Sequence, residues 1–131
     1  MAVQLTDAQQ NILADKNFAH VATLNKDGSP QVSPVWVGFD GTHVIINSER
    51  KRLKVRNLKR DPRVSLSVQS GANPYAYVEI RGHAVEITEK GGFEGIDAFA
   101  KKYLSLDDYP GNKPGDVRVV IKIVPEHVTG Q

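Results

Sequence analysis

The feature that most constrains the fold of this chain is a series of short apolar runs separated by tight-turn sequences. The first run, Phe18–Leu24, is followed by Asn-Lys-Asp-Gly at 25–28, which is typical of a turn. The second run, 31–39, ends at Asp40-Gly41, and a third run covers 43–47. An Asp-Gly pair between two such runs favours a β-hairpin. Two hairpins in series predict an antiparallel meander.

Three further runs extend this β pattern. Residues 64–69 and 117–124 have the alternation expected of strands. Within 75–88, small or apolar residues occupy the even positions and polar or aromatic residues the odd ones. This split predicts one core face and one face for function or for an interface. Six strands without βαβ alternation predict a mainly β protein, a single antiparallel β-barrel domain that spans residues 1–131.

Short helices are expected between some of these strands. Thr6 or Asp7 is suited to cap the first helix. A second helix is predicted at 51–60, and Pro62 should end it because proline disfavours the helical conformation in the residue before it. Apolar side chains at helical spacing predict a third helix at 92–104.

The composition and motifs of the chain exclude several kinds of functional site. The chain has no cysteine, which excludes disulfides, thiolate metal sites and a cysteine nucleophile, and fits a cytoplasmic protein. The four histidines lack metal-ligand helical spacing, and no serine–histidine–aspartate pattern is visible, so neither a metal site nor a catalytic residue is predicted. The sequence shows no secretory signal and no apolar run of membrane-spanning length, so no membrane partner is expected.

Positive charge is concentrated in one segment, residues 50–63. This segment contains eight of the 17 basic residues and one of the 15 acidic residues, so the rest of the chain is mildly acidic. Such concentration indicates a local anion site better than a nucleic-acid surface, and no nucleic-acid partner is expected. A solvated basic helix is the simpler alternative, because runs of charge usually face water. The basic residues are Arg50, Lys51, Arg52, Lys54, Arg56, Lys59, Arg60 and Arg63.

The spacing within this segment restricts how it could hold a phosphate. Arg52 and Arg56 are four residues apart and would share a helix face, whereas Lys54 would lie nearly opposite in an ideal helix. If Arg52 and Lys54 bind the same phosphate, the chain there must still be extended and the helix must begin later. Arginine would supply forked donors and lysine a mobile point charge. Solvent or acidic neighbours are expected for the remaining members, Lys59, Arg60 and Arg63.

The second strand offers another group of polar side chains. Gln31 and Ser33 alternate on one of its faces, and Pro34 within the run suggests an edge or bulged position. The polar pair could hydrogen-bond a planar heteroaromatic ring; alternatively, it faces water while Trp36 and the valines are core. The two tyrosines at the start of the 75–88 run could stack on a ring or pack across a dimer interface.

Two motifs carry a family resemblance. Gly-x-Pro-x-x-x-Pro occupies 28–34, and Arg-x-Lys-x-Arg-Asn-Leu-x-x-Asp-Pro-Arg occupies 52–63. Together with the run Phe18–Leu24 they resemble the pyridoxamine 5′-phosphate oxidase-like split-barrel proteins. Within that group the sequence is most similar to the actinobacterial deazaflavin-dependent reductases that use coenzyme F-420. The resemblance covers nearly the whole chain.

The resemblance implies a fold and a site. The fold would be a six-stranded antiparallel split β-barrel, FMN-binding-like and dimeric, with cofactor sites at the interface of the homodimer. Four groups of cofactor-binding residues are implied: Arg52, Lys54 and Arg56 at the phosphate; Gln31, Val32, Ser33 and Pro34 along the ring; Asn47 and Ser48 at the cofactor's side chain; and Tyr75 and Tyr77 from the partner subunit.

The activity implied by the resemblance is that of an oxidoreductase. Reduced coenzyme F-420 would transfer a hydride to an electron-poor small-molecule substrate, with the loop 107–113 bordering the pocket. The alternatives are an FMN-binding flavin reductase or oxidase of the same family and a non-enzymatic cofactor-binding protein. Vitamin B6 oxidation is not expected, because residues 123–131 lack the arginine of the oxidases' substrate motif.

Overall fold

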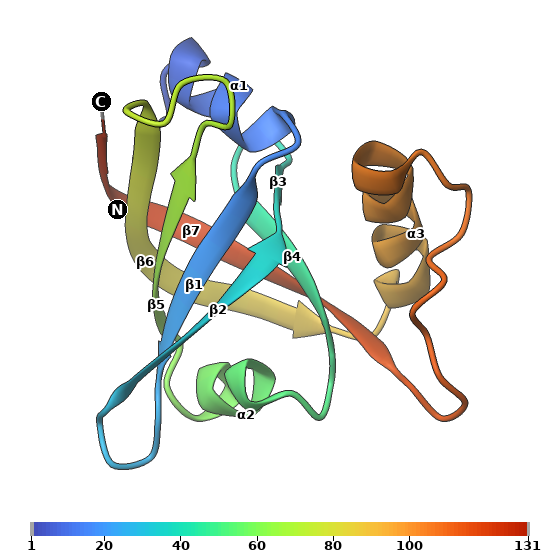
Figure 1. Ribbon diagram of the computed structural model, residues 1–131. Coiled ribbons are helices and arrows are strands. Elements are labelled where there is room, and N and C mark those ends of the chain that lie inside the picture. The colour runs from blue at the N-terminus through green and yellow to red at the C-terminus, as the bar shows by residue number, and fades with distance from the viewer. Residues whose placement is uncertain (1, 131) are drawn as a thin grey trace.

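The computed structural model describes residues 2–130, which form a seven-stranded antiparallel sheet in the order β2-β1-β5-β6-β7-β4-β3. Figure 1 shows this sheet curled into a half-barrel, with α3 standing to one side. The elements are α1 (Asp7–Ala14), β1 (Phe18–Leu24), β2 (Pro30–Trp36), β3 (Gly38–Phe39), β4 (Val44–Glu49), α2 (Leu53–Arg60), β5 (Arg63–Gln69), β6 (Tyr77–Thr88), α3 (Gly92–Leu104) and β7 (Arg118–Gly130).

The predicted mainly β, split-barrel fold is confirmed, but the strand number is corrected from six to seven. The single strand expected at 31–39 is divided: β2 pairs with β1, whereas β3 pairs with β4 at the other end of the sheet order. Val37 lies at the break. Its N–H donates to the hydroxyl of Tyr103, and its carbonyl accepts from Lys102 Nζ at 2.7 Å, so helix α3 replaces a neighbouring strand.

The core follows the period-2 pattern of the strands. Val78 and Ile80 of β6 are fully buried, as the even-position pattern predicts, while Tyr77 and Arg81 are exposed. The alternation changes at Gly82, where the β6–β7 register shifts. A side-chain carbon at Gly82 would lie 1.9 Å from the carbonyl oxygen of Val124, so only glycine permits this close approach.

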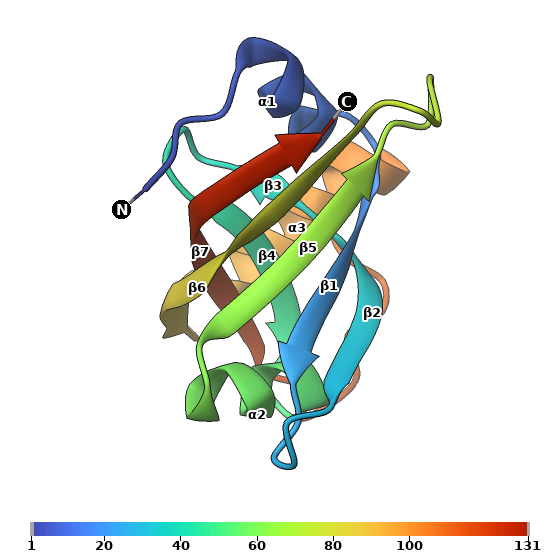
Figure 2. The same ribbon diagram turned by 90° about the vertical axis from the view of Figure 1, so that its left-hand side faces the viewer.

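The helices begin and end close to their predicted limits. Thr6 caps α1 through a capping box with Gln9, and α2 ends at Arg60, before Pro62. Figure 2 shows α1 at one end of the half-barrel and α2 at the other. Among residues 2–130, no helix combines the length and hydropathy needed to cross a membrane.

Candidate functional site

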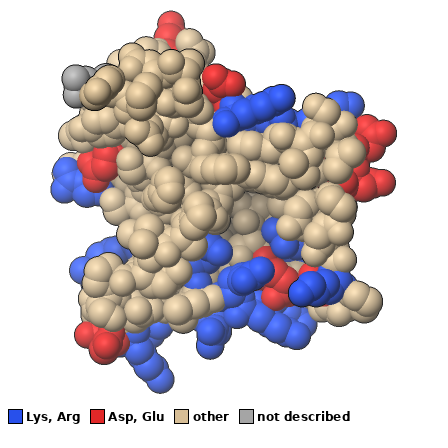
Figure 3. Space-filling view, viewed as in Figure 1, with Lys and Arg blue, Asp and Glu red and all other residues tan. Residues whose placement is uncertain are grey.

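A cavity of about 450 Å³ opens between the barrel and α3; we call it the site cavity. Figure 3 shows a hollow in this face, with lysine and arginine side chains gathered along one edge. Its volume falls in the usual range of small-molecule pockets. The lining residues are Phe18, Ser33, Pro34, Val35, Trp36, Asn47, Ser48, Glu49, Arg52, Lys54, Ile96, Tyr109 and Arg118.

Three cations line one part of the site cavity: Arg52, Lys54 and Arg118. Arg52 has an extended backbone (φ −63°, ψ 147°) and is the N-cap of α2, which begins at Leu53. The helix therefore begins late enough for both Arg52 and Lys54 to face the cavity, which is the geometry that a shared phosphate would require. Arg56 is exposed and does not line the cavity.

The three cations influence one another. Burial is the largest cause of the lowered pKa of Lys54, and the charges of Arg52 and Arg118 lower it further. Burial is likewise the largest cause of the lowered pKa of Arg118. Tyr109, Asp116 and Glu49 partly offset this shift, and the charge of Arg52 adds to it. Like charges gathered in a half-buried position favour an anion at the site.

Glu49 lies beside these cations, but its carboxylate is bonded to the backbone. One oxygen accepts from the N–H of Val117 at 2.9 Å and the other from the N–H of Lys51 at 2.8 Å. These bonds, with that of Val117 the larger cause, lower the pKa of Glu49 and favour its ionised form. Glu49 thus fixes the backbone on both sides of the cation cluster.

Asn47 connects β4 to α3 and β7. Its Nδ2 donates to the carbonyl of Gly92 at 2.8 Å, and its Oδ1 accepts from Nε of Arg118 at 3.0 Å. A side-chain carbon at Gly92 would lie 2.0 Å from the carbonyl oxygen of Arg118, and one at Gly95 would lie 3.1 Å from Asn47 Nδ2. The two glycines let α3 approach the sheet and form one wall of the site cavity.

The opposite wall is formed by β2. Ser33 Oγ is buried and has no hydrogen-bond partner within residues 2–130. Pro34 lies in an edge strand, as predicted, because β2 has β1 as its only strand neighbour in the described sheet. An unpartnered buried hydroxyl is costly in a protein interior, so Ser33 is a natural donor or acceptor for a bound molecule.

Aromatic rings line the remaining side. Trp36 stacks on Tyr103 with ring centroids 5.0 Å apart and meets Tyr109 edge-on at 5.7 Å. Tyr103 also stacks on Phe18 at 5.9 Å. The prediction that the loop 107–113 borders the pocket is confirmed for Tyr109, whose N–H is held by the Asp97 carboxylate at 2.8 Å.

Six of the predicted cofactor-binding residues line the site cavity: Ser33, Pro34, Asn47, Ser48, Arg52 and Lys54. The other five lie outside it: Gln31, Val32, Arg56, Tyr75 and Tyr77. The amide oxygen of Gln31 accepts from the hydroxyl of Thr23 at 3.0 Å, and Val32 is 62% exposed. The contribution expected from the partner's tyrosines stays a prediction, since a single chain does not test it.

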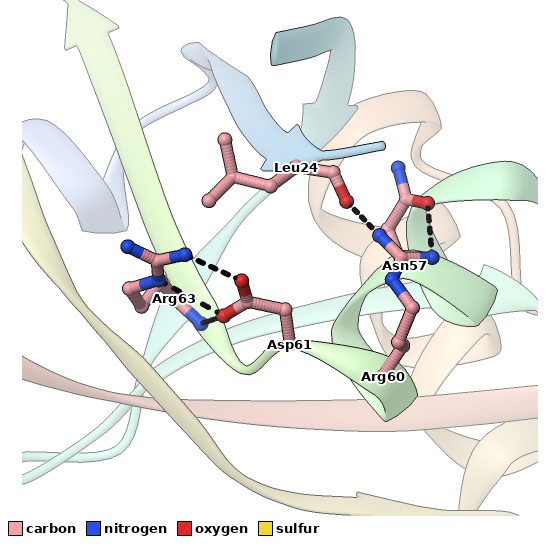
Figure 4. A network of polar contacts seen from close by, with 5 residues as sticks. All are labelled: Leu24, Asn57, Arg60, Asp61 and Arg63. Atoms are coloured by element: carbon pink, nitrogen blue, oxygen red, sulfur yellow. Dashed lines mark hydrogen bonds and ion pairs between the residues drawn. The ribbon is translucent and has the colours of Figure 1, made fainter. Parts of the chain in front are cut away.

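Asn57 and Arg60, in the C-terminal half of α2, anchor this helix to the β1–β2 hairpin (Figure 4). Nδ2 of Asn57 donates to Thr23 Oγ1 and to Asn25 Oδ1, each at 3.0 Å, and Arg60 bonds to Asn57 and to the carbonyl of Leu24. Arg63 pairs with Asp61 at 2.7 Å, so its expected acidic neighbour is confirmed. Arg60 instead binds carbonyl oxygens, which the sequence pattern did not indicate.

Arg118 is the main residue that the sequence analysis missed. It belongs to no recognised motif and is more than fifty residues from the basic segment. The β4–β7 register, which pairs Glu49 with Arg118, brings the guanidinium to the cavity. The local concentration of charge could therefore not identify it.

Comparisons with known proteins agree with this architecture. The family described as pyridoxamine 5′-phosphate oxidase matches residues 5–131. An F420 reductase of known structure is 30% identical, with a TM-score of 0.84 over 97% of this chain and 100% of that chain. HupZ of Group A Streptococcus is 19% identical, with a TM-score of 0.70 over 96% of this chain and 93% of that chain, which shows the fold alone.

The curled antiparallel sheet, with a cationic cavity beside its edge strand β2, is the split-barrel architecture of the pyridoxamine 5′-phosphate oxidase-like proteins. The chain belongs to the pyridoxamine 5′-phosphate oxidase family, whose model covers nearly all of it. Its residues also fit a phosphate-bearing, planar cofactor: Arg52 and Lys54 are suited to the phosphate, and the unpartnered hydroxyl of Ser33 to a polar ring.

Proposed function

We propose that this chain is an oxidoreductase that binds reduced coenzyme F-420 in the site cavity and uses it to reduce an electron-poor small molecule. The observation that carries this proposal is the presence in one cavity of two cations, Arg52 and Lys54, and an unpartnered buried hydroxyl, Ser33. A phosphate attached to a planar polar ring complements both features. The family match and the 30% identity to an F420 reductase support the assignment.

Each wall of the site cavity has a task in this proposal. Arg52 binds the phosphate through forked donors and Lys54 adds a point charge. Ser33 and Pro34 orient the ring, and Trp36 helps to exclude water. When bound in its reduced form, the deazaflavin supplies a hydride to the substrate, while the protein supplies binding, orientation and electrostatics. We assign the accompanying proton to solvent.

FMN is the alternative occupant, because it offers a phosphate and a similar ring to the same residues. A cofactor-binding protein without turnover would also use this cavity. The excess of positive charge in the basic segment, residues 50–63, favours the deazaflavin, whose tail carries carboxylates in addition to its phosphate. The three possibilities differ in cofactor preference and in turnover, so measurements on one purified protein separate them.

A titration of apoprotein with coenzyme F-420 and with FMN tests the proposal. We expect saturable F-420 binding in the micromolar range, tighter than FMN binding, and an increase in melting temperature. A ligand present at 100 times its dissociation constant should add about 2.7 kcal/mol to the free energy of unfolding. Arg52→Gln and Lys54→Gln should each weaken F-420 binding by roughly tenfold, since each removes a charge-assisted contact.

Arg50→Gln is the matched control for these variants. Arg50 is exposed, pairs with Glu89 at 3.4 Å and does not line the site cavity, so its loss should leave cofactor affinity nearly unchanged. Absence of saturable binding by either cofactor would overturn the proposal. Tighter binding of FMN would assign the site to FMN, and binding without reduction of any electron-poor acceptor would indicate cofactor storage.

We also propose that two copies of the chain assemble and complete each site. Large apolar side chains lie exposed near the cavity, on the outer face of the sheet and in the turn before β6: Phe18 is 54%, Val32 62% and Tyr75 78% exposed. Exposed apolar residues of this size are typical of an interface. Tyr75 and Tyr77 would then reach the cofactor of the partner subunit.

A further inference from the structure

Arg118 is a third cation in the site cavity, beyond the two that a cofactor phosphate would use. A phosphate monoester carries about −1.5 to −2 charges at neutral pH, which Arg52 and Lys54 can offset. Arg118 approaches from a different element, the first residue of β7. Its positive charge is therefore available to a second anionic group in the same cavity.

The guanidinium of Arg118 is held in place without a direct ion pair to any described residue. Its Nε donates to Oδ1 of Asn47 at 3.0 Å, and Asn47 is itself buried and bonded to the carbonyl of Gly92. Within residues 2–130, no carboxylate forms an ion pair with Arg118, and both oxygens of the nearby Glu49 accept backbone N–H groups. The terminal nitrogens thus remain available as a fork of donors.

A planar aromatic surface lies directly against this guanidinium. The guanidinium carbon of Arg118, Cζ, lies 5.2 Å from the centroid of the Tyr109 ring, which is a cation–π contact. Tyr109 in turn meets Trp36 edge-on, and both rings line the site cavity. A forked cation beside two aromatic rings complements a flat molecule that bears a carboxylate.

We infer that Arg118, Tyr109 and Trp36 form a substrate subsite, in which Arg118 binds the carboxylate of a planar aromatic substrate. The inference rests on the proposed function for the identity of the ligand as a substrate. The subsite selects anionic over neutral aromatic molecules. It is distinct from the phosphate contacts of Arg52 and Lys54, although all three cations share the cavity.

Trp36 provides a direct readout, because it is the only tryptophan in the chain and lines the site cavity. Apoprotein is titrated with benzoate and with benzamide, which match in shape and differ in charge, while the tryptophan fluorescence is followed. Wild-type protein should bind benzoate at least roughly tenfold more tightly than benzamide. The preference should vanish in Arg118→Gln and shrink in Arg118→Lys, because lysine keeps the charge but not the fork.

Arg50→Gln is the control and should retain the preference for benzoate in full, because Arg50 does not line the site cavity. Arg52→Gln separates the phosphate contacts from this subsite: the preference should persist there, reduced far less than in Arg118→Gln. The inference is overturned by equal affinities in wild-type protein, by a preference that survives in Arg118→Gln, or by one that is lost in Arg52→Gln. Melting curves establish that each variant is folded; if Arg118→Gln is not, the Arg118→Lys comparison decides, and an undiminished preference there overturns the inference.

Calorimetry on protein saturated with coenzyme F-420 or FMN separates substrate from cofactor. Benzoate should bind the cofactor-loaded protein with unchanged affinity, because its subsite lies apart from the phosphate. Competition between benzoate and cofactor would assign Arg118 to the cofactor and overturn the inference. If neither cofactor binds, the proposed function fails, and the preference measured on apoprotein alone decides whether Arg118 recognises a carboxylate.

Discussion

Ser33 has a buried hydroxyl oxygen that forms no hydrogen bond with any residue in the described part of the chain. Burying such a group without a partner costs about 1–3 kcal/mol. The residue faces the site cavity from the edge strand β2, so a bound ring could supply the missing partner. Under the proposed function, Ser33 would lower the stability of the cofactor-free protein and gain a specific contact when the cofactor binds.

Replacing Ser33 by alanine should separate these two effects. In Ser33→Ala, the melting temperature of the apoprotein should stay the same or rise, because the unpartnered hydroxyl is gone. Cofactor affinity should fall by roughly threefold to tenfold, the value of one neutral hydrogen bond. Thermal melts and cofactor titrations measure both. A drop in apoprotein stability with unchanged affinity would show that Ser33 only packs the strand.

Asp61 is the residue whose protonation is most clearly set by a neighbour. Hydrogen bonds from Arg63 lower the pKa of Asp61 to about 2, the largest coming from the side chain. Because the pKa in the folded state lies below that of the unfolded state, this pair stabilises the fold at pH values above about 4. The contribution is lost as the pH falls from about 4 through about 2.

An NMR titration of the side-chain carboxyl checks this pKa. In Arg63→Gln, the pKa of Asp61 should rise toward the value of an unperturbed aspartate, and the loss of stability between about pH 4 and about pH 2 should shrink, because the folded and unfolded pKa values become nearly equal. Lys59→Gln, an exposed change on the same segment, should leave the titration unchanged. An ordinary pKa for Asp61 in the wild-type protein would contradict the expectation.

At the scale of elements, the position of α2 decides whether Arg52 and Lys54 can face the same bound anion. The helix has only eight residues, too few to be stable alone, so its orientation depends on tertiary contacts. Val55 and Leu58 bury one face, and Asn57, 1% exposed, ties the helix to Thr23 and Asn25 of the β1–β2 hairpin. The hairpin that carries Ser33 and the helix after Arg52 are thereby held as one unit.

Removing the Asn57 side chain tests this coupling. Asn57→Ala should lower the free energy of unfolding by about 1–3 kcal/mol, because Thr23, Asn25 and Arg60 lose their buried partner. It should also weaken cofactor binding, since Arg52 and Lys54 would be less well placed. Urea denaturation and cofactor titration measure the two effects. Lys59→Ala, an exposed neighbour, should change stability by no more than about 0.5 kcal/mol.

At the scale of the molecule, the exposed outer face of the sheet bears on assembly. The strand registers pair Val32 with Ala22, Ala22 with Ser65, and Ser65 with Arg81, so these residues share one face. Tyr77 is four residues before Arg81 in β6 and lies on the same face. A stable dimer would need to bury about 1,200–2,000 Å² of such surface.

A charge placed on this face should disrupt the proposed dimer. Val32→Asp and Tyr77→Asp should shift the protein toward monomer in sedimentation or light-scattering measurements and weaken cofactor binding. Leu106→Asp is the control, because Leu106 is 44% exposed in the loop after α3 rather than on the shared face. A wild-type protein that stays monomeric at micromolar concentrations would rule out the two-copy site.

Much of this protein follows from its sequence by local rules. The turns and the period-2 runs give the strands. The helix expected at 51–60 begins at Leu53 instead, which agrees with the condition that Arg52 must be extended if it and Lys54 are to face one ligand. The sequence did not predict the contacts of Gln31. Gln31 and Ser33 do lie on the same face of β2, but the amide oxygen of Gln31 accepts a hydrogen bond from Thr23, and that contact depends on the β1–β2 pairing.

Only the tertiary structure decided the side of the site cavity that α3 and Arg118 form. The division of 31–39 into two strands depends on Lys102 and Tyr103, and the position of Arg118 depends on Asn47, Gly92 and the β4–β7 register. Hydrophobic period and turn chemistry act over a few neighbouring residues, so the sequence determines them directly. Contacts between residues dozens of positions apart depend on which strands pair and how closely a helix packs, and those are settled by the folded chain as a whole.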